Sequence, residues 1–193
     1  MTTMLLDEIQ PVWHFGNRHS RVIDASADRV AQALETLDMD REVSPFVRLL
    51  FRARGLRPPS GATPRDALAS TGFSVLAERP GREIVFGIAG KFWAPREMAN
   101  LEPVTDPAGY KAFAVPGKAK GAMTFVIEPL ADGRTLLKTE TRVTCSDARA
   151  RILFAAYWAL IKIPSGLIRH DLLHALARRA EQYSRDPELR VVG

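Results

Sequence analysis

One long helical pattern near the C-terminus, residues 146–184, constrains the fold more than any other feature of the sequence. It follows a succession of strand-like segments. Ser146 can cap its start, and the pair Pro164-Ser165 predicts an interruption or kink near its middle. About 37 residues of helix would extend about 55 Å, which is more than the sheet of a small domain. We therefore expect a kinked helix that covers one face of an antiparallel sheet.

The segments before this helix predict one strand, then two helices, then further strands. Residues 19–26 are typical of a strand. Ser26 can cap a helix over 27–37, and a second helix is expected from Pro45 to near Gly55. The strand-like segments that follow are 72–81, 82–90, 96–104, 110–115, 121–130 and 134–145.

Length and composition indicate one soluble globular domain. The chain has 193 residues, of which 46% are apolar and 25% charged. We assign an N-terminal arm to residues 1–18, the domain to 19–185 and a tail to 186–193.

Several function and compartment classes are disfavoured by the sequence. The net charge is +5, but the basic residues are scattered and no basic run interleaves with aromatic residues, which argues against nucleic-acid binding. A single cysteine, Cys145, leaves no intrachain disulfide. The N-terminus lacks the pattern of a secretory signal, and the apolar stretch 152–164 is too short to span a bilayer. We expect a cytoplasmic protein without integral membrane insertion and, since nucleotide-binding and nucleophile motifs are missing, without a cofactor.

Four stretches carry a resemblance to a known family: "GKFWAP" at 90–95, "AVPGKAK" at 114–120, "DGRTLLKTETRV" at 132–143, and "FAAYWALIKIPSGLIRHDLLHALARRAE" at 154–181. Together they resemble the bacterial SRPBCC branch of the helix-grip superfamily, which includes START lipid-transfer domains, the birch-pollen-allergen family and polyketide cyclases. The resemblance covers about residues 19–183. It implies an α+β helix-grip fold: an antiparallel sheet of about six or seven strands wrapped around a long kinked C-terminal helix, with two short helices after the first strand.

The resemblance also implies a function. Members of the superfamily bind apolar or amphipathic small molecules between the sheet and the long helix, and some catalyse cyclisation or dehydration there. We expect binding of a lipid-like or polyketide-like molecule in such a cavity. Two alternatives stay open: a cyclase- or dehydratase-type enzyme that uses the same cavity, and a non-catalytic dimeric structural protein with a filled core.

The first half of the long helix is apolar nearly all round, so its second side needs a cover. The N-terminal arm, the pair of short helices or another subunit would supply one, so a homodimer is one of the open alternatives, and a membrane-surface contact is another. Helical spacing places Ile152, Ala156, Ala159 and Ile163 toward the sheet, with Phe154 and Trp158 on the opposite side.

Alternation along the strands and helical spacing select candidates for the cavity. Arg169 falls within the apolar face of the long helix, where its guanidinium needs an internal carboxylate or a ligand's carboxylate or carbonyl. The apolar candidates equally suit a filled core. The full set is Arg169, Phe73, Phe86, Ile88, Phe92, Trp93, Phe113, Phe125, Glu140, Leu172 and Leu176.

The inward face of strand 134–145 is left open by the pattern. Glu140 and Arg142 share one face with Leu136 and Lys138. The opposite set, which includes Leu137 and Val143, looks more core-like and would place Glu140 outside in a solvated ladder. A wide, wet cavity would reverse this assignment.

His170, Asp171 and His174 form H-D-x-x-H, one methylene short of the zinc-protease signature. The two histidines share a helical face, but it is the polar one. Only His14 and His19 remain to supply a third ligand. We interpret the pair as solvated histidines, and predict neither a metal site nor metallohydrolase activity. No catalytic residue is assigned.

Overall fold

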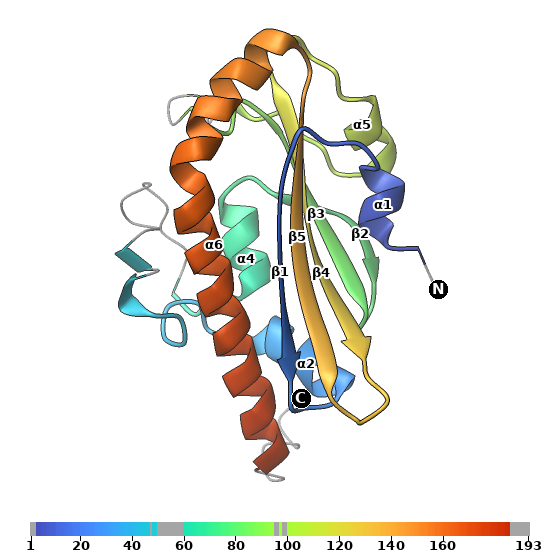
Figure 1. Ribbon diagram of the computed structural model, residues 1–193, viewed down its shortest axis with the longest axis vertical. Helices are drawn as coiled ribbons and strands as arrows, with labels where there is room; N and C mark the ends of the chain where they lie inside the picture. The colour runs from blue at the N-terminus through green and yellow to red at the C-terminus, as the bar shows by residue number, and fades with distance from the viewer. Residues whose placement is uncertain (1–2, 47, 50–59, 95–96, 98–99, 186–193) are drawn as a thin grey trace.

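The structure is a computed structural model that describes residues 3–46, 48–49, 60–94, 97 and 100–185. Five strands form one sheet, and helices cover both of its faces (Figure 1). In chain order the elements are α1 (Leu5–Ile9), β1 (Phe15–Ile23), α2 (Ala27–Thr36), α4 (Pro64–Ser70), β2 (Ser74–Arg79), β3 (Glu83–Gly90), α5 (Pro107–Ala112), β4 (Ala119–Pro129), β5 (Thr135–Cys145) and α6 (Ala148–Arg185).

The sheet is antiparallel throughout, in the order β1-β5-β4-β3-β2. Because β1 pairs with β5, the first strand lies at the edge beside α6 (Figure 1). One face of the sheet, here called the inner face, carries α2, α4 and α6, whereas α1 and α5 cover the opposite, outer face. The expected α+β arrangement of an antiparallel sheet against a long C-terminal helix is confirmed.

The sheet has five strands rather than the expected six or seven. Residues 110–115 do not form a strand, because α5 occupies Pro107–Ala112. Asp106 caps this helix by accepting hydrogen bonds from two backbone N–H groups, and Pro107 fits its first turn. Of the expected strand 96–104, the described residues contribute one isolated bridge, between Glu102 and Ala89.

The inner-face core joins the sheet to the helices. Ile23, Phe86, Phe125 and Leu137 on the strands pack with Leu176 and its neighbours on α6. Most of the expected second helix, from Pro45 to near Gly55, lies outside the described residues. The short helix α4 was not expected, although Thr63 and Asp66 form a reciprocal capping box at its start and Pro64 begins it.

Helix α6 continues through Pro164, so the predicted interruption at Pro164-Ser165 is wrong. The helix curves along the inner face and extends beyond the sheet (Figure 1). By length and composition it is long and apolar enough to cross a membrane, the one such helix in the described chain. Its second half packs in the core through Leu172, Leu173 and Leu176.

The first half of α6 has the opposite orientation to the one expected. Phe154 is buried against the sheet, whereas Ile152 and Ile163 are exposed at 70% and 73% of their surface. Hydrophobicity could not choose between the faces because both are apolar. The small residues Ala119 and Gly121 on β4 leave room for the large aromatic rings. The outward stripe, which we call the α6 stripe, consists of Ile152, Leu153, Leu160, Ile163 and Leu167.

Candidate functional site

A cavity of about 210 Å³ lies between the inner face of the sheet, α4 and α6. Its wall is mostly apolar. The strands contribute Ile88, Gly121, Met123, Phe125, Thr141 and Val143; the remaining lining residues are Met39, Pro64, Ala67, Leu68, Thr71, Phe73, Phe92, Phe154, Tyr157, Trp158, Ile161, Ser165, Ile168, Arg169 and Leu172.

Strand register explains which side chains reach this cavity. Ile88, Gly121 and Val143 are cross-strand partners on β3, β4 and β5 and therefore share the inner face. Met123 and Thr141 form the next rung of the same face. Gly121 has no side chain, and a Cβ there would meet Ile88, Phe92 and Val143 at 3.4–3.5 Å. The missing side chain is one reason why space remains in the wall.

Aromatic rings close one end of the cavity. Phe154 on α6 lies 5.7 Å from Phe92 and 5.9 Å from Trp158, between ring centroids. Trp93 also packs edge-on against Phe154, with 5.5 Å between their ring centroids. Such edge and stacked contacts stabilise the cluster beyond simple burial. The aromatic end is therefore a rigid apolar wall.

Arg169 supplies the charge in the cavity. Its Nη1 donates to the Met123 sulfur at 3.0 Å and to Thr139 Oγ1 at 3.2 Å. Its Nε is buried without a hydrogen-bond partner. None of the ion pairs in the described part of the chain includes Arg169. Burial lowers its pKa to about 10, so the guanidinium stays charged at neutral pH.

Two further polar atoms beside Arg169 have no hydrogen-bond partner among the described residues: Thr141 Oγ1, in the cavity wall, and Nε2 of His19 on β1. His19 pairs across the sheet with Thr139 and packs against Gly166 of α6. Burial lowers the pKa of His19, and the charges of Arg169 and His170 lower it further. His19 is therefore neutral at pH 7, and Arg169 is the cation of this polar end.

The structure brings six of the predicted site residues to the cavity wall. Five candidates lie elsewhere. Phe86 lines a second hollow, Trp93 packs behind Phe92, and Leu176 is fully buried in the core. Phe113 packs on the outer face, where Glu140 also lies. The six lining residues are Arg169, Phe73, Ile88, Phe92, Phe125 and Leu172.

Sequence reasoning missed Thr141, Met123, Tyr157 and Trp158 as lining residues. Thr141 carried a signal, since it alternates with Leu137 and Val143 on the more core-like face of β5. Met123 also carried a signal, since it alternates with the predicted site residue Phe125 along the same strand face. Tyr157 and Trp158 carried no usable signal, because the first half of α6 is apolar on every side.

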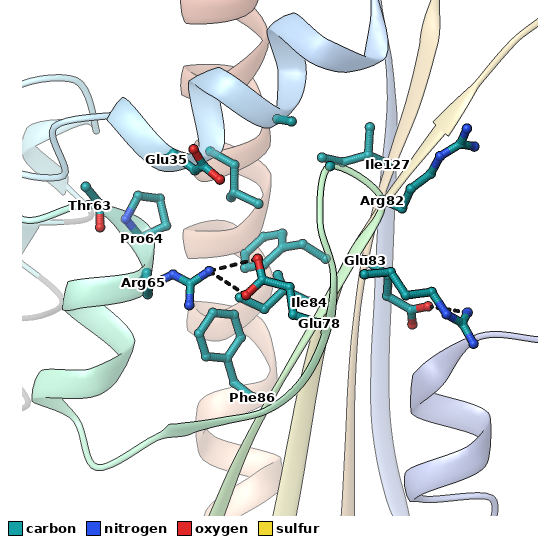
Figure 2. A pocket seen from close by; sticks show the side chains of 15 residues that line it. Glu35, Thr63, Pro64, Arg65, Glu78, Arg82, Glu83, Ile84, Phe86 and Ile127 are labelled. Atoms are coloured by element: carbon teal, nitrogen blue, oxygen red, sulfur yellow. Dashed lines mark hydrogen bonds and ion pairs between the residues drawn. The ribbon is translucent and has the colours of Figure 1, made fainter. Parts of the chain in front are cut away.

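The second hollow, of about 120 Å³, opens beside α2, α4 and the β2–β3 hairpin (Figure 2). Arg65 on α4 donates from one nitrogen to both carboxylate oxygens of Glu78 on β2, at 2.9 Å each. Phe86 lies beneath this pair and separates it from the interior. Because Arg65 and Glu78 neutralise each other and the space is smaller, we place the candidate site in the larger cavity.

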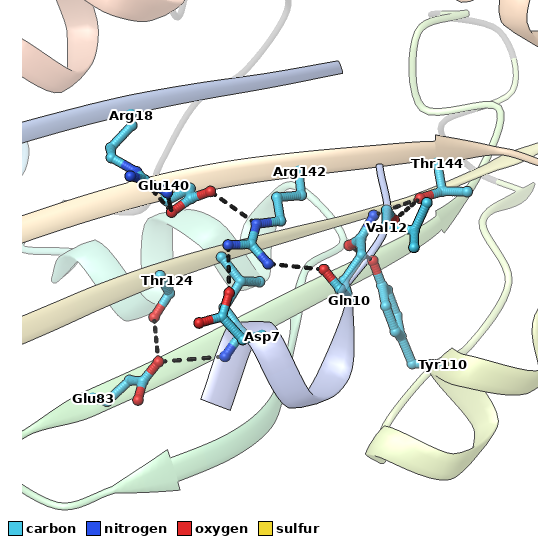
Figure 3. A network of polar contacts seen from close by, with 11 residues as sticks. Asp7, Gln10, Val12, Arg18, Glu83, Tyr110, Thr124, Glu140, Arg142 and Thr144 are labelled. Carbon is cyan, nitrogen blue, oxygen red and sulfur yellow. Dashed lines mark hydrogen bonds and ion pairs between the residues drawn. The ribbon is translucent and has the colours of Figure 1, made fainter. Parts of the chain in front are cut away.

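Glu140 belongs to a polar network on the outer face (Figure 3). Its carboxylate contacts both Arg18 and Arg142 at 2.8 Å, and Arg142 also reaches Asp7 at 2.6 Å and the Gln10 carbonyl at 2.9 Å. Glu140 and Arg142 are 5% and 2% exposed, so the expected solvated ladder is wrong. Helix α1 covers this face, and its presence could not be read from the strand's alternation.

His170 and His174 lie on the side of α6 that faces away from the cavity and contact each other, with 3.2 Å between their Nε2 atoms. The Nε2 of His174 also lies 2.8 Å from Nη1 of Arg21 on β1. Burial, together with the nearby Arg21 charge, lowers the pKa of His174. In the described chain no group of three potential metal-ligating side chains surrounds them.

A five-stranded antiparallel sheet that holds one long C-terminal helix against its inner face defines the architecture. This arrangement is a helix-grip fold. No family model matches the sequence, and no curated protein matches it.

Comparison with solved structures gives similarities at low sequence identity, among them the following three. The di-domain ARO/CYC protein BexL from the BE-7585A biosynthetic pathway is 14% identical with a TM-score of 0.38; the match covers 90% of this chain and 48% of BexL, so this chain spans about half of that protein. Protein CV1439 from Chromobacterium violaceum is 15% identical with a TM-score of 0.35, over 84% of this chain and 95% of that one. The protein TTHA0849 from Thermus thermophilus is 11% identical with a TM-score of 0.32, over 88% of this chain and 99% of that one.

Proposed function

We propose that this helix-grip protein binds a hydrophobic or amphipathic small molecule in the cavity between the sheet and α6. The observation that carries the proposal is a mostly apolar cavity that contains one charged group, Arg169, without an ion-pair partner among the described residues. Apolar walls with a few placed polar groups are typical of small-molecule sites. A filled core would leave neither the space nor the unpaired charge.

The size of the cavity limits the ligand. About 210 Å³ is below the roughly 300–1,000 Å³ of common ligand pockets, but it exceeds the cavity of about 150 Å³ that accepts benzene in another protein. A compact body, such as one ring or a chain of medium length, suits this space. A longer lipid-like or polyketide-like molecule would extend through the open side.

Binding fits the site better than catalysis. Of the described lining residues, Tyr157 and Arg169 alone carry ionisable side chains, and neither titrates near neutral pH in its ordinary form. General acid–base chemistry works best with a group whose pKa lies near the working pH. Burial raises the pKa of the Cys145 thiol to about 11, so this residue is no ready nucleophile either. A cyclase- or dehydratase-type reaction stays a prediction.

Filling the cavity tests the proposal. In Gly121→Leu the Cβ fits at ordinary contact distance, and the rest of the side chain would occupy the cavity. Val126→Leu adds a methylene on the opposite face of the same strand and serves as the control. Native mass spectrometry of protein purified from its own host should show a small-molecule adduct on the wild type and the control. We expect Gly121→Leu to lose it. An adduct that persists on a folded Gly121→Leu protein would place binding elsewhere.

A further inference from the structure

The polar end of the cavity has hydrogen-bonding capacity that the described residues leave unused. Arg169 Nε and Thr141 Oγ1 are buried without partners, and both residues belong to the cavity wall. Nε2 of the neighbouring His19 is also buried without a hydrogen-bond partner. Buried polar atoms in folded proteins almost always have a hydrogen-bond partner. Two of the four such side-chain atoms in the described chain belong to this cavity wall, and they indicate that a ligand supplies what the protein lacks there.

The positive charge at this end of the cavity determines the sign of the charge that the ligand must carry. The guanidinium of Arg169 contacts two neutral groups, the Met123 sulfur and the Thr139 hydroxyl. The chain has a direct comparison in Arg142, a buried arginine, which is paired with both Glu140 and Asp7, whereas Arg169 is partly buried. Burying a cation without an anion is unfavourable. The missing partner at Arg169 is therefore an anion.

The number of cations limits the charge of that anion. His19 remains neutral at pH 7 because burial and the Arg169 charge lower its pKa. Lysine is absent from the described cavity wall, and Arg169 is its one arginine. A single positive charge is balanced by one negative charge, whereas a phosphate monoester would bring close to two. A carboxylate provides one charge and several acceptor sites for the Arg169 N–H and the Thr141 hydroxyl.

We propose that the ligand is a small monocarboxylic acid, whose carboxylate accepts hydrogen bonds from Arg169 and Thr141 and whose apolar body lies against Ile88, Phe125 and Trp158. This inference rests on the proposed function and adds the chemical class of the ligand. The cavity volume favours a single ring or a medium-length chain over a long acyl chain.

A matched pair of probes tests the carboxylate. Octanoate and octan-1-ol have the same chain length and differ at the head group. We expect wild-type protein to bind octanoate at least about tenfold more tightly than octan-1-ol by calorimetric titration, since hydrogen bonds to charged groups exceed neutral ones. Arg169→Met should remove this preference while it retains octan-1-ol binding. Thr141→Val should weaken octanoate binding by a smaller factor.

The controls separate this inference from the function on which it rests. Arg151→Met changes an exposed arginine on the same helix and should bind both probes like the wild type. Thermal unfolding verifies that each variant is folded; Arg169→Met should melt at or above the wild-type temperature because it removes an unpaired buried charge. If Arg169→Met keeps the preference for octanoate, or if wild type binds octan-1-ol equally well, the carboxylate site is wrong although the cavity still binds. If wild type binds neither probe, the proposed function fails for compact ligands.

Discussion

The buried Arg142 and the partly buried Arg169 show how the surroundings of a residue separate a structural role from a functional one. Arg142 has two carboxylates, a backbone carbonyl and the ring of Trp13, whose centroid lies 3.9 Å from its guanidinium carbon. Arg169 has a sulfur and a hydroxyl. Paired buried charges are expected in a stable fold, whereas an unpaired one is retained against its energetic cost. The sequence placed Arg169 on an apolar helix face, but it could not show that no carboxylate of the described residues would pair with it.

At the same scale, two histidines predict a pH dependence of stability. Burial lowers the pKa of His19 and of His174 in the folded protein, below the ordinary value of 6.5 that the unfolded chain keeps. As the pH falls below that value, the unfolded chain takes up protons that the folded chain resists. The free energy of unfolding should therefore decrease from about pH 7.5 to about pH 5.5, a window above the titration of ordinary carboxylates.

Urea unfolding at both pH values measures this decrease. His19→Gln should make it smaller, because it removes one of the two groups. Asn17→Gln, which changes a residue without a titratable group on the same face of β1, should keep the wild-type decrease. An unchanged pH dependence in His19→Gln would show that this histidine does not titrate between the two states.

At the scale of elements, the spacing of apolar residues and the turn residues between them predicted β3, β4, β5 and the long helix. The pattern failed where a short helix replaced a strand. Helix α5 depends on the Asp106 cap, whose local hydrogen bonds outweigh a few residues of apolar alternation. Helix α4, which replaced no expected strand, depends on the Thr63 capping box. The pattern also failed for the first half of α6. Its orientation depends on which side chains fit against Gly121 and Ala119, a tertiary property that spacing does not contain.

Gly166 lies near the middle of α6, where glycine is a poor helix former. A Cβ at this position would meet His19 at 3.6 Å and Asn17 at 3.9 Å, which are ordinary contacts. Gly166→Ala should therefore stabilise the protein by about 0.5–1 kcal/mol in urea unfolding. Gly87→Ala is the contrasting variant, because its Cβ would lie 2.4 Å from Leu76 Cδ1, and it should destabilise. A loss of stability in Gly166→Ala would mean that α6 and β1 pack too closely for a methyl group.

For the whole molecule, the sheet separates two layers. The inner layer, between the sheet and α2, α4 and α6, contains the cavity, and the outer layer is covered by α1 and α5. The sequence predicted the first layer through the resemblance it carries, but it treated the residues of α1 as an arm. Cytoplasmic location and the division into arm, domain and tail stay predictions. So does the homodimer, for which the exposed α6 stripe is the available surface.

The oligomeric state checks that prediction directly. Light scattering after size-exclusion chromatography should give twice the chain mass of 21.4 kDa for the wild type. Leu160→Glu places a charge on a residue of the α6 stripe that is 76% exposed, and should give the mass of one chain while circular dichroism remains unchanged. Gln182→Glu, also exposed on α6 but outside the stripe, should behave like the wild type. A wild-type mass of one chain would show that the homodimer prediction is wrong.

The positions of the three tryptophans allow intrinsic fluorescence to monitor ligand binding in the cavity. Trp158 forms part of the cavity wall and Trp93 packs against the same phenylalanine, Phe154, whereas Trp13 lies over Arg142 on the far side of the sheet. Any molecule that enters the cavity changes the surroundings of the Trp158 indole and leaves those of Trp13 unaltered. The intrinsic fluorescence of a Trp13→Phe variant would therefore report whether the cavity is occupied, without an added dye. The difference between the intact chain and this variant would give the fluorescence of Trp13, which reports on the contact of the N-terminal segment with Arg142.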